Sequence, residues 1–141
     1  MKVAVLGAIG ALAIGALIPL AANGAGGNAP ALYSTAQVTS GGKLYAAKCG
    51  LCHGASLEGG AGPPLAGPNM TTLGTKTHLT VGDMFGYITS NMPMNAPASL
   101  THDQYVAVLA YILNKNGYPA GSKPLTYANA NASKAMVRSY K

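Results

Sequence analysis

Two stretches of the chain carry apolar residues at the i, i+3, i+4, i+7 spacing that places side chains on one face of a helix. The first comprises Val81, Met84, Phe85 and Ile88, and the second comprises Tyr105, Val108, Leu109 and Ile112. A third, less regular stretch runs from about Ser40 to Lys48, where Leu44, Tyr45 and Ala47 can face inward. No stretch alternates apolar and polar residues as a half-buried strand does. The pattern predicts an all-α fold with three main helices and long loops.

Polar residues at the ends of these stretches indicate where the helices begin and end. Thr80 offers a capping hydroxyl to the first, and Asp83 places an acid in its first turn. Thr101 and Gln104 have the spacing of a capping box at the start of the second. Gly117 is suited to the left-handed position that follows a helix end.

Composition divides the chain around these helices. Residues 38–117 are predicted to form the folded domain, preceded by a tether at 23–37 that is rich in Gly, Ala, Asn and Pro. Residues 118–141 lack a periodic core pattern, so we expect a solvated tail or surface wrap, with a docking segment for a larger partner as the alternative. A loop-rich domain of about 80 residues has too little side-chain core to be comfortably stable alone. Something else is expected to fill its middle.

The first 22 residues form a targeting segment. Lys2 is followed by an uncharged, apolar run over residues 3–22, which is expected to form an N-terminal helix. The run is long enough to span a bilayer and no Ala-x-Ala follows it directly, which favours a retained membrane anchor over a cleaved signal peptide. Under either alternative the rest of the chain lies outside the cytoplasm, in the periplasm or at the outer face of the cytoplasmic membrane.

Charge is sparse and one-sided, because nine Lys and Arg residues against three Asp and Glu residues give a net charge of +6. Such a balance fits nucleic acid, an anionic membrane or an acidic protein. The basic residues are scattered and no groove-reading motif is present, so nucleic acid is excluded. An acidic docking surface of a protein and lipid headgroups are the partners left for this positive charge.

The two cysteines of the chain lie in one motif, Cys49-Gly50-Leu51-Cys52-His53, which is typical of haem attachment. Two thiols one helical turn apart can add to the two vinyl groups of a single porphyrin, and the adjoining His53 can bind the iron. A thioredoxin-like dithiol needs a βαβ setting, which the pattern does not predict. A zinc site needs more ligands than His78 and His102 can supply.

The segment from Val38 to Gly117 resembles the class I cytochrome c family. Gly41 and Tyr45 precede Cys49 at the family's four-residue spacings, and Ala110-Tyr111-Ile112 resembles the segment that crosses its first helix. The resemblance implies a cytochrome c fold, with three main helices around one covalently attached haem c. It also implies that the loop Gly62–Gly67 lies at the haem edge, that the Pro63 carbonyl accepts a hydrogen bond from His53, and that Leu65 packs on the porphyrin.

The resemblance further implies a methionine as the second axial ligand of the iron. Met92, in a Met-Pro pair about forty residues after His53, is favoured, with Met94 as the alternative. Met70 is expected in the core or at the surface, and Met84 on a helical core face. His102 is expected to face solvent, and His78 to lie in a loop.

These features predict a one-electron carrier rather than an enzyme. The expected donors are a dehydrogenase or a quinol-oxidising complex, and the expected acceptors are a terminal oxidase or another cytochrome. The alternative is a permanent cytochrome subunit of a membrane-bound dehydrogenase or respiratory complex, because the segment from Asn91 to Gly121 resembles cytochromes associated with periplasmic dehydrogenases. A haem-based sensor of small ligands, with Met92 displaceable, is the remaining alternative.

Overall fold

The computed structural model describes Met1 and residues 29–141. The predicted apolar helix at 3–22 and most of the predicted tether lie outside the described residues. Among the residues that are described, no helix combines the length and apolar character needed to cross a bilayer.

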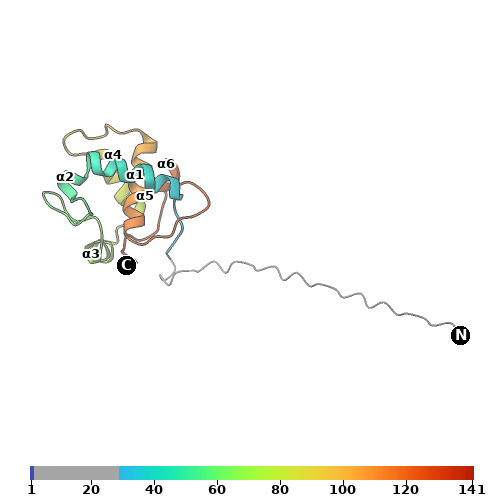
Figure 1. Cartoon of the computed structure of the whole chain (residues 1–141). Coiled ribbons are helices and arrows are strands. Elements are labelled where there is room, and N and C mark those ends of the chain that lie inside the picture. Colours follow the sequence, from blue (N-terminus) through green and yellow to red (C-terminus); the bar gives the residue numbers. More distant parts are fainter. Residues whose placement is uncertain (2–28) are drawn as a thin grey trace.

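The described part of the chain is helical (Figure 1). Its helices are α1 (Thr35–Lys48), α2 (Gly50–His53), α3 (Pro68–Thr77), α4 (Val81–Asn91), α5 (His102–Lys115) and α6 (Tyr127–Asn131). Over residues 29–141 the β pairing is limited to two isolated bridges, Tyr33 with Ala120 and Thr80 with Met136. The all-α prediction is confirmed.

The three predicted helices are α1, α4 and α5. At the start of α4 the Asp83 amide donates to the Thr80 hydroxyl over 3.1 Å, and at the start of α5 the Gln104 amide donates to Thr101 over 3.3 Å. Gly117 has a φ of +82°, as expected just beyond the end of α5. Helix α1 begins earlier than predicted, because the side chain of Gln37 accepts a hydrogen bond from the Ser34 amide over 3.1 Å.

Helices α1 and α5 cross at a glycine. A β-carbon on Gly41 would lie 1.9 Å from the carbonyl oxygen of Ala107 and 3.1 Å from the β-carbon of Tyr111. Only a residue without a side chain permits this approach. The crossing therefore fixes α1, and with it the motif that follows α1, against α5, the helix with the most buried residues.

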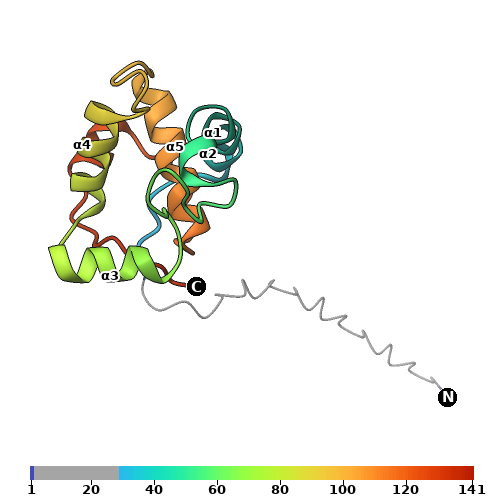
Figure 2. The same cartoon turned by 90° about the vertical axis from the view of Figure 1, so that its left-hand side faces the viewer.

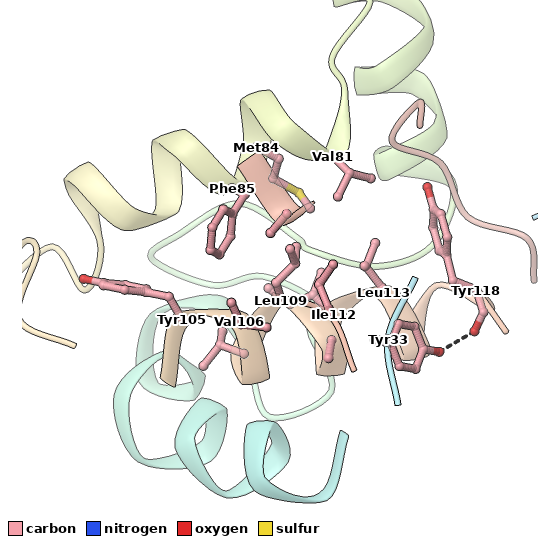
Figure 3. Close-up of a cluster of buried hydrophobic side chains, with 14 of the residues drawn as sticks. Tyr33, Val81, Met84, Phe85, Tyr105, Val106, Leu109, Ile112, Leu113 and Tyr118 are labelled. Atoms are coloured by element: carbon pink, nitrogen blue, oxygen red, sulfur yellow. Dashed lines mark hydrogen bonds between the residues drawn. The ribbon is translucent and has the colours of Figure 1, made fainter. Parts of the chain in front are cut away.

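The side chains of α4 and α5 meet in the core (Figure 3). Val81 and Phe85 of α4 are fully buried, as are Leu109 and Ile112 of α5 to within 2%. The two apolar faces read from the sequence thus pack on each other. Met84, 7% exposed, belongs to this core as predicted.

Helix α3 was not predicted. It begins at Pro68, a residue suited to the first helical position, and ends at Thr77. Its buried residues are Met70 and Gly74, too few to form an apolar stripe. His78 follows it with a φ of +54°. Figure 2 shows α3 and α4 on one side of the molecule and α1 with α5 on the other.

The segment after Gly117 wraps the surface of the domain, which is one of the two arrangements expected for residues 118–141, and it is more deeply packed than a solvated tail. Leu125, Ala130 and Val137 are buried, and the segment lies along α3 and α4 (Figure 2). The Ala135 carbonyl accepts a hydrogen bond from the Val81 amide over 2.8 Å, and the Val137 amide donates to the Leu79 carbonyl over 2.9 Å. These main-chain bonds make the segment part of the folded unit.

The start of the described chain is also packed into the fold, although it falls within the predicted tether. Tyr33 is fully buried, and its hydroxyl donates to the carbonyl of Tyr118 (Figure 3). The Gly121 amide donates to the Tyr33 carbonyl over 2.7 Å. The folded unit therefore extends beyond the predicted bounds of 38–117 at both ends.

Candidate haem attachment site

The Cys49–His53 motif forms a turn of helix that continues from α1 at an angle. Cys49 ends α1, donating to the Tyr45 carbonyl over 2.8 Å, and precedes α2. Its own carbonyl accepts from the amides of Cys52 and His53 over 3.1 and 2.9 Å. Both cysteines are free thiols, and they lie one helical turn apart on one short element.

The environment of these thiols differs from that of a reactive dithiol. Burial raises the pKa of the Cys49 thiol, and the neighbouring Cys52 adds to the increase. Dithiol oxidoreductases and nucleophilic cysteines instead depend on a lowered thiol pKa. The Cys49 thiol therefore lacks the lowered pKa on which thiol exchange depends.

His53 is held in a defined tautomer. Its ring is 9% exposed, and Nδ1 lies 2.8 Å from the carbonyl oxygen of Pro63. Because a carbonyl only accepts hydrogen bonds, Nδ1 must carry the proton. The other nitrogen, Nε2, then keeps its lone pair, which is the form that binds a metal ion.

The loop after the motif folds back onto it. The Gly62 amide donates to the Cys52 carbonyl over 2.8 Å, and a β-carbon on Gly62 would lie 2.8 Å from Cε1 of His53. The Leu65 amide donates to the carbonyl of the buried Leu57 over 2.9 Å. The sequence Gly62-Pro63 thus lets the backbone approach the imidazole edge closely.

Tyr45 supports the motif from α1. Its side chain is 1% exposed, and its hydroxyl donates to the Gly54 carbonyl over 2.8 Å. Its ring lies 5.2 Å from that of Tyr111, centroid to centroid. Burial raises the pKa of Tyr45. The phenol therefore stays neutral and continues to donate to the backbone that follows His53.

The two candidate axial methionines differ in exposure. Met92 is half-buried at the end of α4, and its carbonyl accepts from the Tyr105 hydroxyl over 2.6 Å. Met94 is 75% exposed. Tyr105 was read from the sequence only as a core residue, and its hydroxyl fixes the backbone of the Met92 loop.

The remaining candidates lie elsewhere. Met70 is 2% exposed in the core. His102 is exposed, as expected, and stacks on Tyr127 with a centroid distance of 3.7 Å. His78 is exposed at the end of α3. Within the described residues, no three His, Cys, Asp or Glu side chains come together as a metal-binding group.

Sequence reasoning missed the role of Asn116 beside the loop. Its side-chain amide donates to the Leu65 carbonyl over 2.8 Å and accepts from the Gly67 amide over 3.1 Å. These partners are about fifty residues away in the chain, so no local pattern indicates them. The only local signal was an Asn-Gly pair at a helix end, which fits a cap equally well.

The residues present fit a c-type haem. Two free thiols one turn apart, a buried imidazole with Nε2 as its lone-pair nitrogen, and a half-buried thioether are the donors that such a group requires. The half-buried Leu65, in the loop Gly62–Gly67, packs against the core and adds apolar surface there.

Comparisons with known proteins agree with this chemistry. Residues 36–112 match the family model described as cytochrome C oxidase, cbb3-type, subunit III. No curated protein matches the chain. Among solved structures, a chain of the sulfane dehydrogenase SoxCD from Paracoccus pantotrophus is similar, with 27% identity and a TM-score of 0.53. The similarity covers 71% of this chain and 52% of that one, so this chain spans about half the length of its structural relative.

The family match covers more than half of the chain and includes the Cys49–His53 motif, the Pro63 loop and Met92. The helical fold agrees with it. The chain therefore belongs to this cytochrome c family and is a small c-type cytochrome of class I.

Proposed function

We propose that the chain carries one electron at a time through a single haem c attached to Cys49 and Cys52, with His53 and Met92 as axial ligands. That the protein is an electron-transfer cytochrome follows from its family. The observation that supports the detailed site is the 2.8 Å hydrogen bond between Nδ1 of His53 and the Pro63 carbonyl, because it orients the imidazole for coordination through Nε2.

One-electron oxidation and reduction are the chemistry that the haem iron supplies when bound. His53 offers Nε2 as the ligand atom. Its other ring nitrogen, Nδ1, donates a hydrogen bond to the Pro63 carbonyl. Met92 offers a neutral thioether, which favours the reduced state more than a second nitrogen ligand does. Tyr105 restrains the Met92 backbone through its hydroxyl. If His53 and Met92 both bound the iron, no open position would be left for a substrate.

The partners are proposed to be redox proteins that approach the thioether side of the haem. Lys43 and Lys48 are exposed on α1, and Lys48 directly precedes Cys49. Their charges suit an acidic partner surface, where rim charges raise the association rate and make it sensitive to salt. A dehydrogenase or quinol-oxidising complex as donor, and an oxidase or another cytochrome as acceptor, fit this chemistry. The expected location is the periplasm or the outer face of the cytoplasmic membrane.

A second candidate is a permanent cytochrome subunit of an oxidoreductase complex. The comparisons favour it specifically, because the family model is described as an oxidase subunit and the similar structure is a sulfane dehydrogenase. A shuttle purifies alone at moderate salt, whereas a permanent subunit stays with its partner.

The deciding experiment is mass spectrometry of the native protein purified from its own host. The proposal expects a mass increase of one haem on the fragment that contains Cys49 and Cys52. Absence of thioether-linked porphyrin on this fragment would contradict it. A stoichiometric partner that survives high salt would select the subunit alternative over the shuttle.

A further inference from the structure

Asn116 and His53 are the two buried polar side chains, tyrosines aside, in the part of the chain that the structure describes. Asn116 is 1% exposed and lies just after α5, whereas His53 is 9% exposed and ends α2. A buried amide is costly unless its donors and acceptor are all paired. The partners of Asn116 therefore indicate what the residue does.

The Asn116 side chain is fully used in holding backbone. Its Nδ2 donates to the Leu65 carbonyl over 2.8 Å and to the Ile112 carbonyl over 2.9 Å. Its Oδ1 accepts from the Gly67 amide over 3.1 Å. One side chain thus links the end of α5 to two positions of the loop Gly62–Gly67.

The same loop carries the carbonyl that orients His53. At its start, the Gly62 amide is held by the Cys52 carbonyl over 2.8 Å. At its end, Leu65 and Gly67 are held by Asn116. Pro63 lies between these two anchors, and its carbonyl is 2.8 Å from Nδ1 of His53. Releasing either anchor would let the Pro63 carbonyl move relative to the imidazole.

Asn116 is itself restrained through its main chain. Its amide donates to the carbonyls of Ile112 and Leu113 over 3.1 Å each, and its carbonyl accepts from the Tyr140 amide over 2.7 Å. The residue is therefore fixed to α5 on one side and to the C-terminal segment on the other. This rigidity allows it to act as an anchor for a loop that lacks regular secondary structure.

We propose that Asn116 is a positioning residue that holds the Pro63 carbonyl against Nδ1 of His53 and thereby tunes the reduction potential of the protein. The inference rests on the proposed function, since it takes His53 as a ligand of the haem iron. A hydrogen bond to Nδ1 makes the imidazole a stronger electron donor, which favours the oxidised state. Loosening this bond is expected to raise the potential.

The test compares Asn116→Ala and Asn116→Ser with the wild-type, haem-loaded, full-length protein. Two readouts are taken by NMR of the reduced protein: exchange of the His53 Nδ1 proton and exchange of the Gly67 amide. The third readout is the reduction potential. We expect both exchange rates to rise by about tenfold or more, as for the loss of about one buried hydrogen bond, and the potential to shift upward.

Asn114→Ala is the matched control. Asn114 is an asparagine in the last turn of α5, and its Nδ2 donates over 3.2 Å to the Tyr33 hydroxyl, which is not part of the loop Gly62–Gly67. Its replacement removes one long-range side-chain hydrogen bond that does not involve the loop, so it reports the effect of a local loss of packing at the end of α5. The control is expected to leave His53 exchange and the potential unchanged.

The serine variant keeps a small hydroxyl that can bond to the Ile112 carbonyl, so it covers the case in which the alanine variant does not fold. Faster Gly67 exchange with unchanged His53 exchange and unchanged potential would overturn the positioning role. A wild-type protein without covalent haem would instead contradict the proposed function. The two failures are therefore distinguishable.

Discussion

The carbonyl oxygen of Ala107 in α5 occupies the space that a β-carbon on Gly41 in α1 would need, at a distance of 1.9 Å. Neither partner can move cheaply, because both belong to helix backbone. Helix α1 packs on α5 at this crossing and leads directly into the Cys49–His53 motif, so the closeness of the crossing sets the position of the motif.

Gly41→Ala is expected to destabilise the protein by about 3 kcal/mol, since overpacking forces the two backbones apart. Gly86→Ala is the control, because a β-carbon there meets nothing within 4 Å. That variant should gain about 0.5 to 1 kcal/mol from the helix preference of alanine. Denaturant unfolding of the two variants measures the difference in their free energies of unfolding. Equal values would show that α1 and α5 do not approach closely at Gly41.

Cys49→Ser and Cys52→Ser are expected to abolish stable haem attachment and to leave a largely unfolded chain, because the bound group stabilises only the folded state. Leu51→Ser provides the control. Leu51 lies between the two cysteines, and its side chain is 96% exposed, so its replacement should leave attachment intact. Haem-stained gels and circular dichroism report both effects. Normal haem content in Cys49→Ser or in Cys52→Ser would contradict attachment through two thioethers.

The helices that the sequence predicted are those in which local signals agree. In α4 and α5, apolar spacing coincides with a capping residue at the start, and both helices begin where Thr80 and Thr101 indicate. The attachment motif is equally local, since Cys49, Cys52 and His53 lie within one turn. Such features need no information about distant parts of the chain.

The parts that were missed depend on long-range backbone contacts. Helix α3 buries only Met70 and Gly74, and a β-carbon on Gly74 would lie 1.8 Å from the Val137 carbonyl. The C-terminal segment is held by main-chain hydrogen bonds at Ala135 and Val137, which leave no side-chain period. The Asn116 contacts join residues about fifty positions apart. None of these produces a pattern within a short window of sequence.

Met92→Ala is expected to lower the reduction potential and to open the iron to carbon monoxide in the reduced protein, because it removes the thioether that we propose as an axial ligand. Met94→Ala is the natural control, since Met94 is 75% exposed. Redox titration and carbon monoxide difference spectra distinguish the two residues. If Met94→Ala has these effects and Met92→Ala does not, the ligand assignment is wrong. Rapid carbon monoxide binding by the wild type would favour a ligand sensor.

Leu125→Ala tests whether the C-terminal segment belongs to the folded unit. Leu125 is 6% exposed, so its truncation should cost about 2 to 3 kcal/mol. Lys123→Ala, at an exposed position two residues earlier, should change stability by less than about 0.5 kcal/mol. Both variants would be neutral in thermal unfolding if residues 118–141 were a solvated tail.

Tyr118, the first residue of the C-terminal segment, makes the stability of the protein depend on alkaline pH. Its hydroxyl donates to the Met136 carbonyl over 2.6 Å, and its burial raises the pKa of Tyr118 to about 12. An unfolded tyrosine has a pKa of about 10. Because the pKa is raised on folding, the stabilisation is fully present below about pH 10 and is lost as the pH rises toward 12.

We therefore expect stability to fall over this interval, and the Tyr118→Phe variant to show a smaller fall from a lower starting stability at neutral pH. Denaturant midpoints measured from neutral pH to about pH 12 check the slope. Carbon-13 NMR of labelled tyrosine follows the phenol of Tyr118 directly and separates its ionisation from changes at the haem. A Tyr118 that titrates like an unfolded tyrosine would show that its hydroxyl does not hold the carbonyl of Met136 in the folded protein.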